Sequence, residues 1–211
     1  MKITIVYDNV VWDPILKADW GFACLVETGD RNLLFDTGAN GSILLSNMKK
    51  LGIDPTSIDA VFISHSHWDH IGGLDDLLKR QPLTVFLPAD CPAPAHAARI
   101  VPVGSPMEIF DSCYSTGSLD GIEQSLVLRQ KNRTIVVAGC SHPGVGKILS
   151  AAARFGSVTA LIGGLHGFDE FSLIERLDAV CPAHCTRHIH TIAQRYPRQY
   201  MAAGAGRVLQ F

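Results

Sequence analysis

The chain has 211 residues, of which 47% are hydrophobic and 18% charged, so it can bury a sizeable core, and one domain over residues 1–211 is expected. Lysine and arginine (18) nearly balance aspartate and glutamate (20), and the formal charge of -2 gives no general electrostatic reason to bind nucleic acid or an anionic membrane surface. No apolar run approaches the length of a membrane span and the first residues lack a secretory pattern, so we expect a soluble, cytoplasmic protein.

The six cysteines are even in number, yet a chain of this size needs no disulfide framework. We therefore expect reduced thiols that pack as small buried hydrophobes.

The first elements predict strands joined by short turns. Residues 2–7 alternate in the manner of a strand, and residues 22–28 and 33–35 form two more around a turn at 29–32, which indicates a hairpin. Between them, residues 9–21 show no clear period and predict a loop. Asp36 directly follows the hairpin, where a carboxylate either forms a turn or orients groups bound to a metal. Residues 42–51 have helical spacing, and Gly52 ends that helix.

A stretch rich in metal-binding side chains follows the next buried strand, residues 60–63. Residues 64–70 read Ser-His-Ser-His-Trp-Asp-His, so three imidazoles and one carboxylate lie within six residues. In an extended segment His65 and His67 point the same way and can reach one ion, while Asp69 and His70 lie past the bend and can reach a second. These donors suit zinc, iron or manganese. A helical zinc-protease motif is excluded, because it needs two histidines four residues apart with a glutamate beside the first.

The middle of the chain predicts a helix over residues 74–80, a strand over 83–87 and a proline-rich connection over 88–94. Residues 100–129 predict the edge of a second sheet, with its clearest strand at 126–128.

In the last third, each histidine of interest follows a strand. Residues 134–138 lead to His142 and to a helix that begins with Pro143 at its first position, and residues 158–162 lead to His166. A helix is expected over residues 171–179, then a short strand at 180–182 that leads to His184. The glycines near residue 205 suggest a hairpin between residues 199–202 and 207–211. A phosphate loop at residues 141–148 is rejected, because Ser141 stands where the motif requires its first glycine and Ile148 where it requires serine or threonine.

Strand ends and the loops behind them are where a rigid scaffold presents functional groups, so these histidines are expected to converge with those of residues 64–70. His188, one helical turn beyond His184, is the nearest rival ligand, and Cys185 is a minor one. A thiolate zinc site around residues 181–185 is disfavoured, because no second cysteine pair stands at a suitable spacing.

The H-x-H-x-D-H loop resembles the signature of the metallo-β-lactamase superfamily. Further segments fit as well: FDTG at residues 35–38, GIEQSL at 121–126, GCSHPG at 139–144, GGLHGF at 163–168 and PAHCT at 182–186. Together they look most like the branch of dihydropterin ribofuranosyl-aminobenzene phosphate synthase-like proteins. The resemblance spans the whole chain and implies an α/β fold, a four-layer αββα sandwich of two mixed sheets flanked by helices, with the metals at one edge of the sheets.

The resemblance also implies a hydrolase with two divalent ions, zinc first and iron or manganese as alternatives, acting on a small phosphorylated or pterin-like ester through a metal-bound hydroxide. Asp69 would hold the hydroxide and pass on its proton, and Asp36 would orient a ligand. The expected ligands are His65, His67 and His142 for one ion, and Asp69, His70 and His184 for the other, with His166 shared or close to the second.

Two other classes stay open. Flavodiiron-like redox proteins share the scaffold but use a flavin domain and more carboxylate ligands, which this chain lacks, and a metal-containing binding protein with little turnover is the third possibility. The chain also departs from the branch at Trp68, Leu165, Gly167 and Arg187, which weakens any carried-over substrate more than the metal site.

The residue at position 166 bears on the charge of the expected site. Many relatives place a bridging aspartate in this loop, whereas here His166 leaves Asp69 as the one carboxylate ligand and the site one charge unit more positive. Such a site is expected to prefer phosphoesters over neutral esters or β-lactams and to be inhibited by phosphate. The rival ligand is Asp169, which equally suits an N-cap of the following helix.

Overall fold

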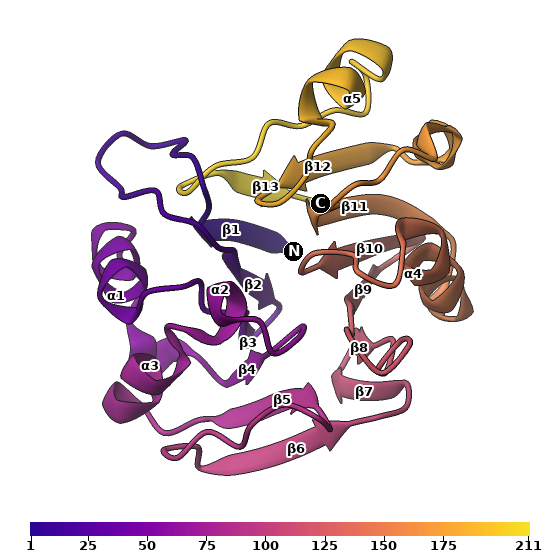
Figure 1. Ribbon diagram of the computed structural model, residues 1–211. Coiled ribbons are helices and arrows are strands. Elements are labelled where there is room, and N and C mark those ends of the chain that lie inside the picture. Colours follow the sequence, from indigo (N-terminus) through magenta and orange to yellow (C-terminus); the bar gives the residue numbers. More distant parts are fainter. The chain divides into compact units, whose positions relative to one another are not determined.

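The computed structural model describes all residues 1–211, and the chain divides into two compact units. Unit 1 comprises Met1–Val103 with Ala203–Phe211, and unit 2 comprises Gly104–Ala202. Each unit contains one β-sheet (Figure 1). No helix combines the length and the apolar character that crossing a membrane requires. The single domain expected over residues 1–211 stays a prediction.

The sheet of unit 1 has seven strands in the order β13-β1-β2-β3-β4-β5-β6. Strands β13, β1, β2 and β3 pair antiparallel, whereas β3, β4, β5 and β6 pair parallel, so the sheet is mixed. Its strands are β1 (Lys2–Tyr7), β2 (Ala23–Thr28), β3 (Arg31–Phe35), β4 (Ala60–Phe62), β5 (Thr84–Pro88), β6 (Arg99–Val103) and β13 (Val208–Gln210).

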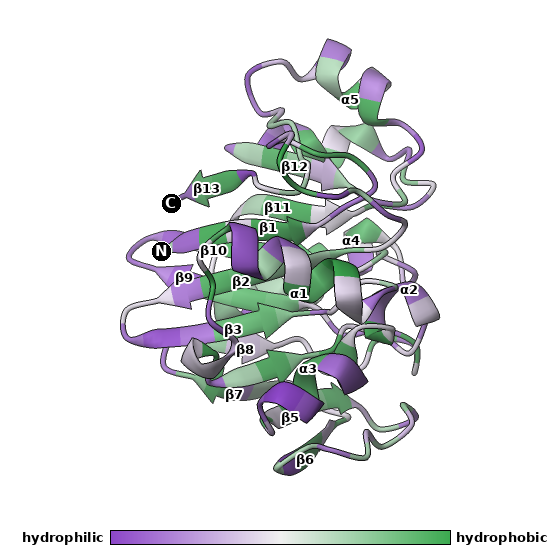
Figure 2. Cartoon of the chain, turned by 90° about the vertical axis from the view of Figure 1, so that its left-hand side faces the viewer, coloured by the Kyte–Doolittle hydropathy of each residue, from purple (hydrophilic) through white to green (hydrophobic).

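Helices α1 (Gly41–Lys50) and α3 (Leu74–Arg80) share one apolar cluster with the strands of this sheet. Helix α1 begins where the Asn40 side chain accepts hydrogen bonds from the backbone N–H groups of Ser42 and Ile43, which is the usual role of an N-cap. The strands are mainly hydrophobic in Figure 2, while α1 and α3 carry hydrophilic segments. A short helix, α2 (Trp68–Ile71), and a 3₁₀ turn (Pro55–Ser57) complete the unit.

The sheet of unit 2 has six strands in the order β12-β11-β10-β9-β8-β7. Strands β10, β11 and β12 pair parallel, and the remaining pairs are antiparallel. Its strands are β7 (Met107–Phe110), β8 (Cys113–Ser115), β9 (Leu126–Gln130), β10 (Arg133–Ala138), β11 (Val158–Gly164) and β12 (Ala179–Ala183). The helical segments are α4 (Val145–Ala152), α5 (Ile189–Arg195) and 3₁₀ helices at Ala153–Phe155 and Phe171–Arg176.

The parallel strands of unit 2 end level with one another. Ala138 at the end of β10 pairs with Gly163, and Gly164 at the end of β11 pairs with Ala183 at the end of β12. The loops that carry His142, His166 and His184 therefore leave the sheet at the same edge. An apolar cluster that includes Ile148 of α4 and Ile192 of α5 packs the helices of this unit against its strands.

Two predictions about sheet membership are wrong. Residues 100–103, the start of the stretch 100–129 expected at the edge of the second sheet, instead belong to β6 (Arg99–Val103) of unit 1, where Pro102 is tolerated because β6 is an edge strand. The expected hairpin at residues 199–211 is absent, since Val208–Gln210 pairs with β1 and Tyr200 bridges to Val180 in unit 2. The intervening glycines instead allow close packing: a Cβ at Gly204, where φ is 136°, would lie 2.8 Å from the Trp12 nitrogen.

Two helix predictions also need correction. The helix expected over residues 171–179 is a 3₁₀ helix that ends at Arg176, and its N-cap residue is Glu170, which makes no side-chain capping bond. The capping role considered for Asp169 is therefore wrong. Helix α4 begins at Val145 rather than at Pro143, because residues 141–144 close a turn in which the Gly144 N–H donates to the Ser141 carbonyl.

Candidate metal centre

In unit 1 the loop that follows β4 is held against the backbone of residues 37–39. A Cβ at Gly72 would lie 2.1 Å from the Ala39 carbonyl oxygen, and a Cβ at Gly73 would lie 2.4 Å from that of Thr37. Only glycine permits this approach. Within this loop His65, Asp69 and His70 are buried, whereas His67, directly before α2, is exposed.

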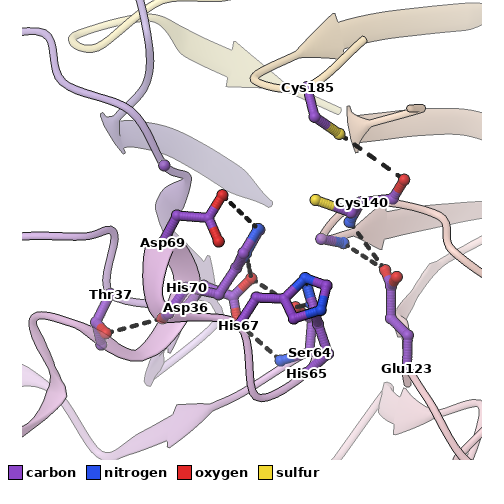
Figure 3. A network of polar contacts seen from close by, with 12 residues as sticks. Asp36, Thr37, Ser64, His65, His67, Asp69, His70, Glu123, Cys140 and Cys185 are labelled. Atoms are coloured by element: carbon purple, nitrogen blue, oxygen red, sulfur yellow. Dashed lines mark hydrogen bonds and ion pairs between the residues drawn. The ribbon is translucent and has the colours of Figure 1, made fainter. Parts of the chain in front are cut away.

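The Asp36 carboxylate lies beneath this loop and is fully buried. Its Oδ1 accepts a hydrogen bond from the Ser64 backbone N–H, and its Oδ2 accepts one from the Ser64 hydroxyl, both at 2.7 Å. The Nδ1 of His70 is also 2.7 Å from Oδ2 (Figure 3). Because an ionised carboxylate only accepts, Nδ1 carries the hydrogen and the lone pair of His70 lies on Nε2.

The same network sets the tautomer of His65. The Ser64 hydroxyl uses its one hydrogen for Asp36, so the Nδ1 of His65, 2.9 Å from that oxygen, donates to it. The lone pair of His65 is thereby placed on Nε2, which lies 3.0 Å from the Nδ1 of His67. One buried carboxylate thus directs two imidazoles to present Nε2.

The donor pairs of unit 1 fit divalent ions. His65 Nε2 and His67 Nδ1 form one pair, and His70 Nε2 with Asp69 Oδ2, 4.0 Å apart, form the other. Ligand distances of about 2.0–2.2 Å allow one ion to span donors up to roughly 4 Å apart. Asp69 Oδ2 also accepts a 2.8 Å hydrogen bond from the indole N–H of Trp20. Trp20 belongs to the 9–21 loop, so this loop helps to fix the orientation of the Asp69 carboxylate.

In unit 2 the loop after β10 is held by Glu123, a residue whose role the sequence did not reveal. Its buried carboxylate accepts hydrogen bonds from consecutive backbone N–H groups: those of Gly139, Cys140 and Ser141 at 3.0 Å on Oε1, and that of His142 at 2.9 Å on Oε2. Such a ring of N–H groups around an anion fixes the path of the loop. The one signal in the sequence for this role is that the GIEQSL segment contains a carboxylate. No short-range sequence pattern links residue 123 to the loop after β10.

The histidines of unit 2 follow this edge. His142 is half-buried, His166 is exposed and its ring lies 5.2 Å from that of His142, and His184 is buried. His166 and His184 have φ values of 45° and 49°, in the left-handed region that non-glycine residues seldom adopt. The Arg187 N–H donates to the His166 carbonyl at 2.9 Å, so these two loops are tied together.

The rival ligands have other surroundings. His188 directly precedes α5, and its ring lies edge-on to Phe171 at 5.9 Å. Asp169 is exposed and lines a pocket of about 370 Å³ together with His142 and His166, so the choice between Asp169 and His166 stays open.

The Cys91 thiol bonds to Ser66 of the metal loop. Burial raises the pKa of this thiol to about 12, and the charge of Asp90 acts in the same direction. Cys91 therefore stays a neutral thiol.

Each unit thus gathers its own share of the predicted ligands. Unit 1 brings together Asp36, His65, His67, Asp69 and His70, and unit 2 places His142, His166 and His184 at one sheet edge. That the two groups serve the same pair of ions stays a prediction.

The two mixed sheets with their helices correspond to the metallo-β-lactamase fold. Residues 21–90 match the family model of the metallo-beta-lactamase superfamily. The crystal structure of Tm1679, a metal-dependent hydrolase of the β-lactamase superfamily, shares 26% sequence identity and gives a TM-score of 0.82, covering 100% of this chain and 99% of that one. The predicted resemblance and the predicted fold class, two mixed sheets with helices, are confirmed.

Two further proteins are similar over nearly their whole length. The 7,8-dihydropterin-6-methyl-4-(beta-D-ribofuranosyl)-aminobenzene-5'-phosphate synthase of Methanocaldococcus jannaschii is 22% identical over 280 residues, covering 99% of this chain and 95% of that protein. The Zn(2+)-bound PqqB of Methylobacterium extorquens has a TM-score of 0.67 at 13% identity, with 100% of both chains covered, and shows the shared fold alone. The chain therefore resembles the metal-dependent hydrolases of this superfamily.

Proposed function

We propose that the protein is a hydrolase with two divalent metal ions that acts on a small phosphorylated or pterin-like ester. The observation that carries the proposal is the Asp36 network, which directs the Nε2 lone pairs of His65 and His70. A purely structural loop has no need to set two tautomers in this way. The name of the similar M. jannaschii synthase includes a pterin and a ribofuranosyl phosphate, which supports the substrate class.

The residues of the site would have distinct roles in metal binding and in hydrolysis. Two divalent ions, when bound, ionise a water molecule and polarise the scissile bond. His65 and His67 would hold one ion, Asp69 and His70 the other, and His142 and His184 would complete the two sets. Asp69 would also orient the attacking water and accept its proton. Asp36 would hold the His70 ring in the tautomer that binds metal.

The site charge suggests the substrate. If His166 rather than Asp169 is a ligand, Asp69 is the one carboxylate ligand, and the ions dominate the local field. We therefore propose an anionic small-molecule substrate, with phosphoesters preferred over neutral esters or β-lactams and inorganic phosphate as a competitive inhibitor. A nucleic-acid substrate is not proposed, because the chain carries a formal charge of -2.

The test combines metal analysis with a substrate panel. We expect close to two divalent ions per chain by elemental analysis, and a chelator-sensitive phosphoesterase activity. His67→Ala should remove the activity and lower the metal content while the circular dichroism spectrum is retained, because His67 is exposed. His190→Ala, an exposed histidine bonded to Gln194, is the matched control. Full metal content and full rate in His67→Ala, or no metal bound after reconstitution, would overturn the proposal.

Two variants distinguish His166 from Asp169 as the metal ligand in the loop after β11. His166→Ala should lose one ion and most of the rate, and Asp169→Ala should leave both nearly unchanged. The opposite pattern would replace His166 by Asp169 and would remove the charge argument for anionic substrates.

A further inference from the structure

Cys140 stands among the histidines of unit 2 as a third kind of donor. Its Sγ lies within 4.8 Å of a ring nitrogen of His142 and within the same distance of one of His184. The side chain is only 3% exposed, so solvent has little access to the sulfur. The donor set at this edge of the sheet therefore contains a buried sulfur beside two imidazoles.

The backbone on both sides of this thiol is fixed. The Cys140 N–H donates to Glu123 at 3.0 Å, and the carbonyl lies 3.9 Å from the Cys185 sulfur, which donates to it (Figure 3). Ser141, the next residue, has a φ of 60° and donates its hydroxyl to the Gly164 carbonyl at 2.7 Å. Rotation about χ1 is therefore the main freedom left to the sulfur, and its position is set by the same loop that sets His142.

The geometry points to Cys140 as a thiolate ligand of the metal centre, beside His142 and His184. The inference rests on the proposed function. Zn–S distances of about 2.3 Å and Zn–N distances of about 2.0–2.1 Å let one ion span roughly 4.4 Å, so a small rotation brings the sulfur into reach of either ion. On binding, the S–H bond loses its proton to solvent and an S–metal bond forms. The thiolate would be a second negative ligand beside Asp69, and two divalent ions would still leave the site positive, so the preference for anionic substrates stands.

Thiolate ligation would change the metal preference of the protein. Nitrogen and oxygen donors alone suit zinc, iron and manganese, whereas a sulfur donor favours the softer ions and disfavours manganese. A protein with this ligand should select zinc or cobalt over manganese.

The experiment uses cobalt(II) as the probe. Metal-free full-length protein is titrated with Co(II) without oxygen, and the near-ultraviolet spectrum is followed for a sulfur-to-cobalt charge-transfer band. We expect the band in the wild type and its loss in Cys140→Ser, with affinity reduced by about 10–100-fold or more. Cys185→Ser tests the rival thiol beside His184, and Cys181→Ser, buried in β12, is the matched control. Both should keep the band.

Proton release gives an independent reading. The wild type should release one more proton per chain on binding Co(II) than Cys140→Ser, measured with an indicator dye in weak buffer. Co(II) binding without the band in the wild type would overturn this inference and leave the proposed function intact, and this outcome does not depend on the folding of any variant. A band that persists in Cys140→Ser, or that is lost in Cys185→Ser alone, would also overturn it. Failure of the wild type to bind Co(II) would overturn the proposed function as well.

Discussion

A single buried carboxylate decides where the protons lie on two imidazoles in unit 1. Asp36 accepts from Ser64 and His70, and Ser64 in turn accepts from His65, so the four side chains form one hydrogen-bond network. The φ of 54° at Asp36 turns the backbone so that this carboxylate faces the loop. If the Asp36 carboxylate were replaced by a group that can also donate, the tautomers of His65 and His70 would no longer be fixed.

Asp36→Asn makes that exchange. The amide can donate as well as accept, so the Nδ1–H of His70 loses its fixed partner, and we expect metal affinity to fall about 10–100-fold. Competition with a chromophoric chelator measures this. Asp59→Asn, which alters a carboxylate bonded to Arg31 and Asn32 in the same unit, should leave the affinity unchanged. Equal affinities in Asp36→Asn and wild type would show that the network has no part in metal binding.

Trp20→Phe tests the indole hydrogen bond to Asp69. Trp20 is 50% exposed, so little packing is lost, whereas the 2.8 Å bond to Oδ2 disappears. We expect weaker binding of one of the two ions, by about tenfold, on the scale of other groups that support ligands. Isothermal titration with Zn²⁺ resolves the two ions. Trp12→Phe, an equally exposed tryptophan in the same loop, serves as control and should match the wild type.

At the scale of elements, the conformation of the loop after β10 is held by hydrogen bonds to Glu123 rather than by residues of the loop itself. The neighbouring glycine and cysteine indicate a turn, but the acceptor that holds the N–H groups comes from the segment between β8 and β9. The loop therefore depends on a contact that is distant in sequence, which local patterns do not predict.

Glu123→Gln should destabilise unit 2. The amide keeps one acceptor and places its own N–H groups against backbone donors, and each buried donor without an acceptor costs about 1–3 kcal/mol. We expect the free energy of unfolding to fall by roughly 2–4 kcal/mol in urea titrations. Glu108→Gln, an exposed glutamate on β7, should change it little. A fall of similar size in both variants would mean that the ring of N–H groups contributes no special stability.

At the scale of the whole chain, the strands and most helices could be predicted from hydrophobic periodicity, and the histidine loops fall at strand ends as expected. Sheet membership could not be predicted, since residues 99–103 and 208–210 carry the same strand pattern whichever sheet they join. Glu123 was missed for the same reason: its partners lie 16 or more residues away, and no period of the sequence reports them. Asp36 could be suspected because it directly follows a strand in the FDTG segment, but its hydrogen-bond partners came only from the structure.

The stability of the chain should also depend on alkaline pH through Cys113 in β8. Burial raises the pKa of this thiol from 9.0 to about 12, with Glu108 adding to the effect. The unfolded chain therefore loses this proton first, so the stabilisation is complete below pH 9 and is lost as the pH rises toward 12. Between pH 8 and pH 10 the wild type should lose about 1–2 kcal/mol more than Cys113→Ala in urea titrations under reducing conditions. Parallel pH profiles for the two proteins would contradict this.

The close packing of residues 204–206 against the 9–21 loop reaches further than the local contact. Ala205 accepts from the N–H groups of Trp12 and Asp13 and donates to the carbonyl of Val10. Backbone hydrogen bonds therefore join the 9–21 loop, which carries Trp20, to residues 204–206, which lead into the edge strand β13. Its opening is a joint event, in which both segments must loosen before either exposes its amides. Native-state hydrogen exchange should then give one common opening free energy for the amides of Trp12, Asp13 and Ala205, and opening of the loop would also loosen this edge of the sheet.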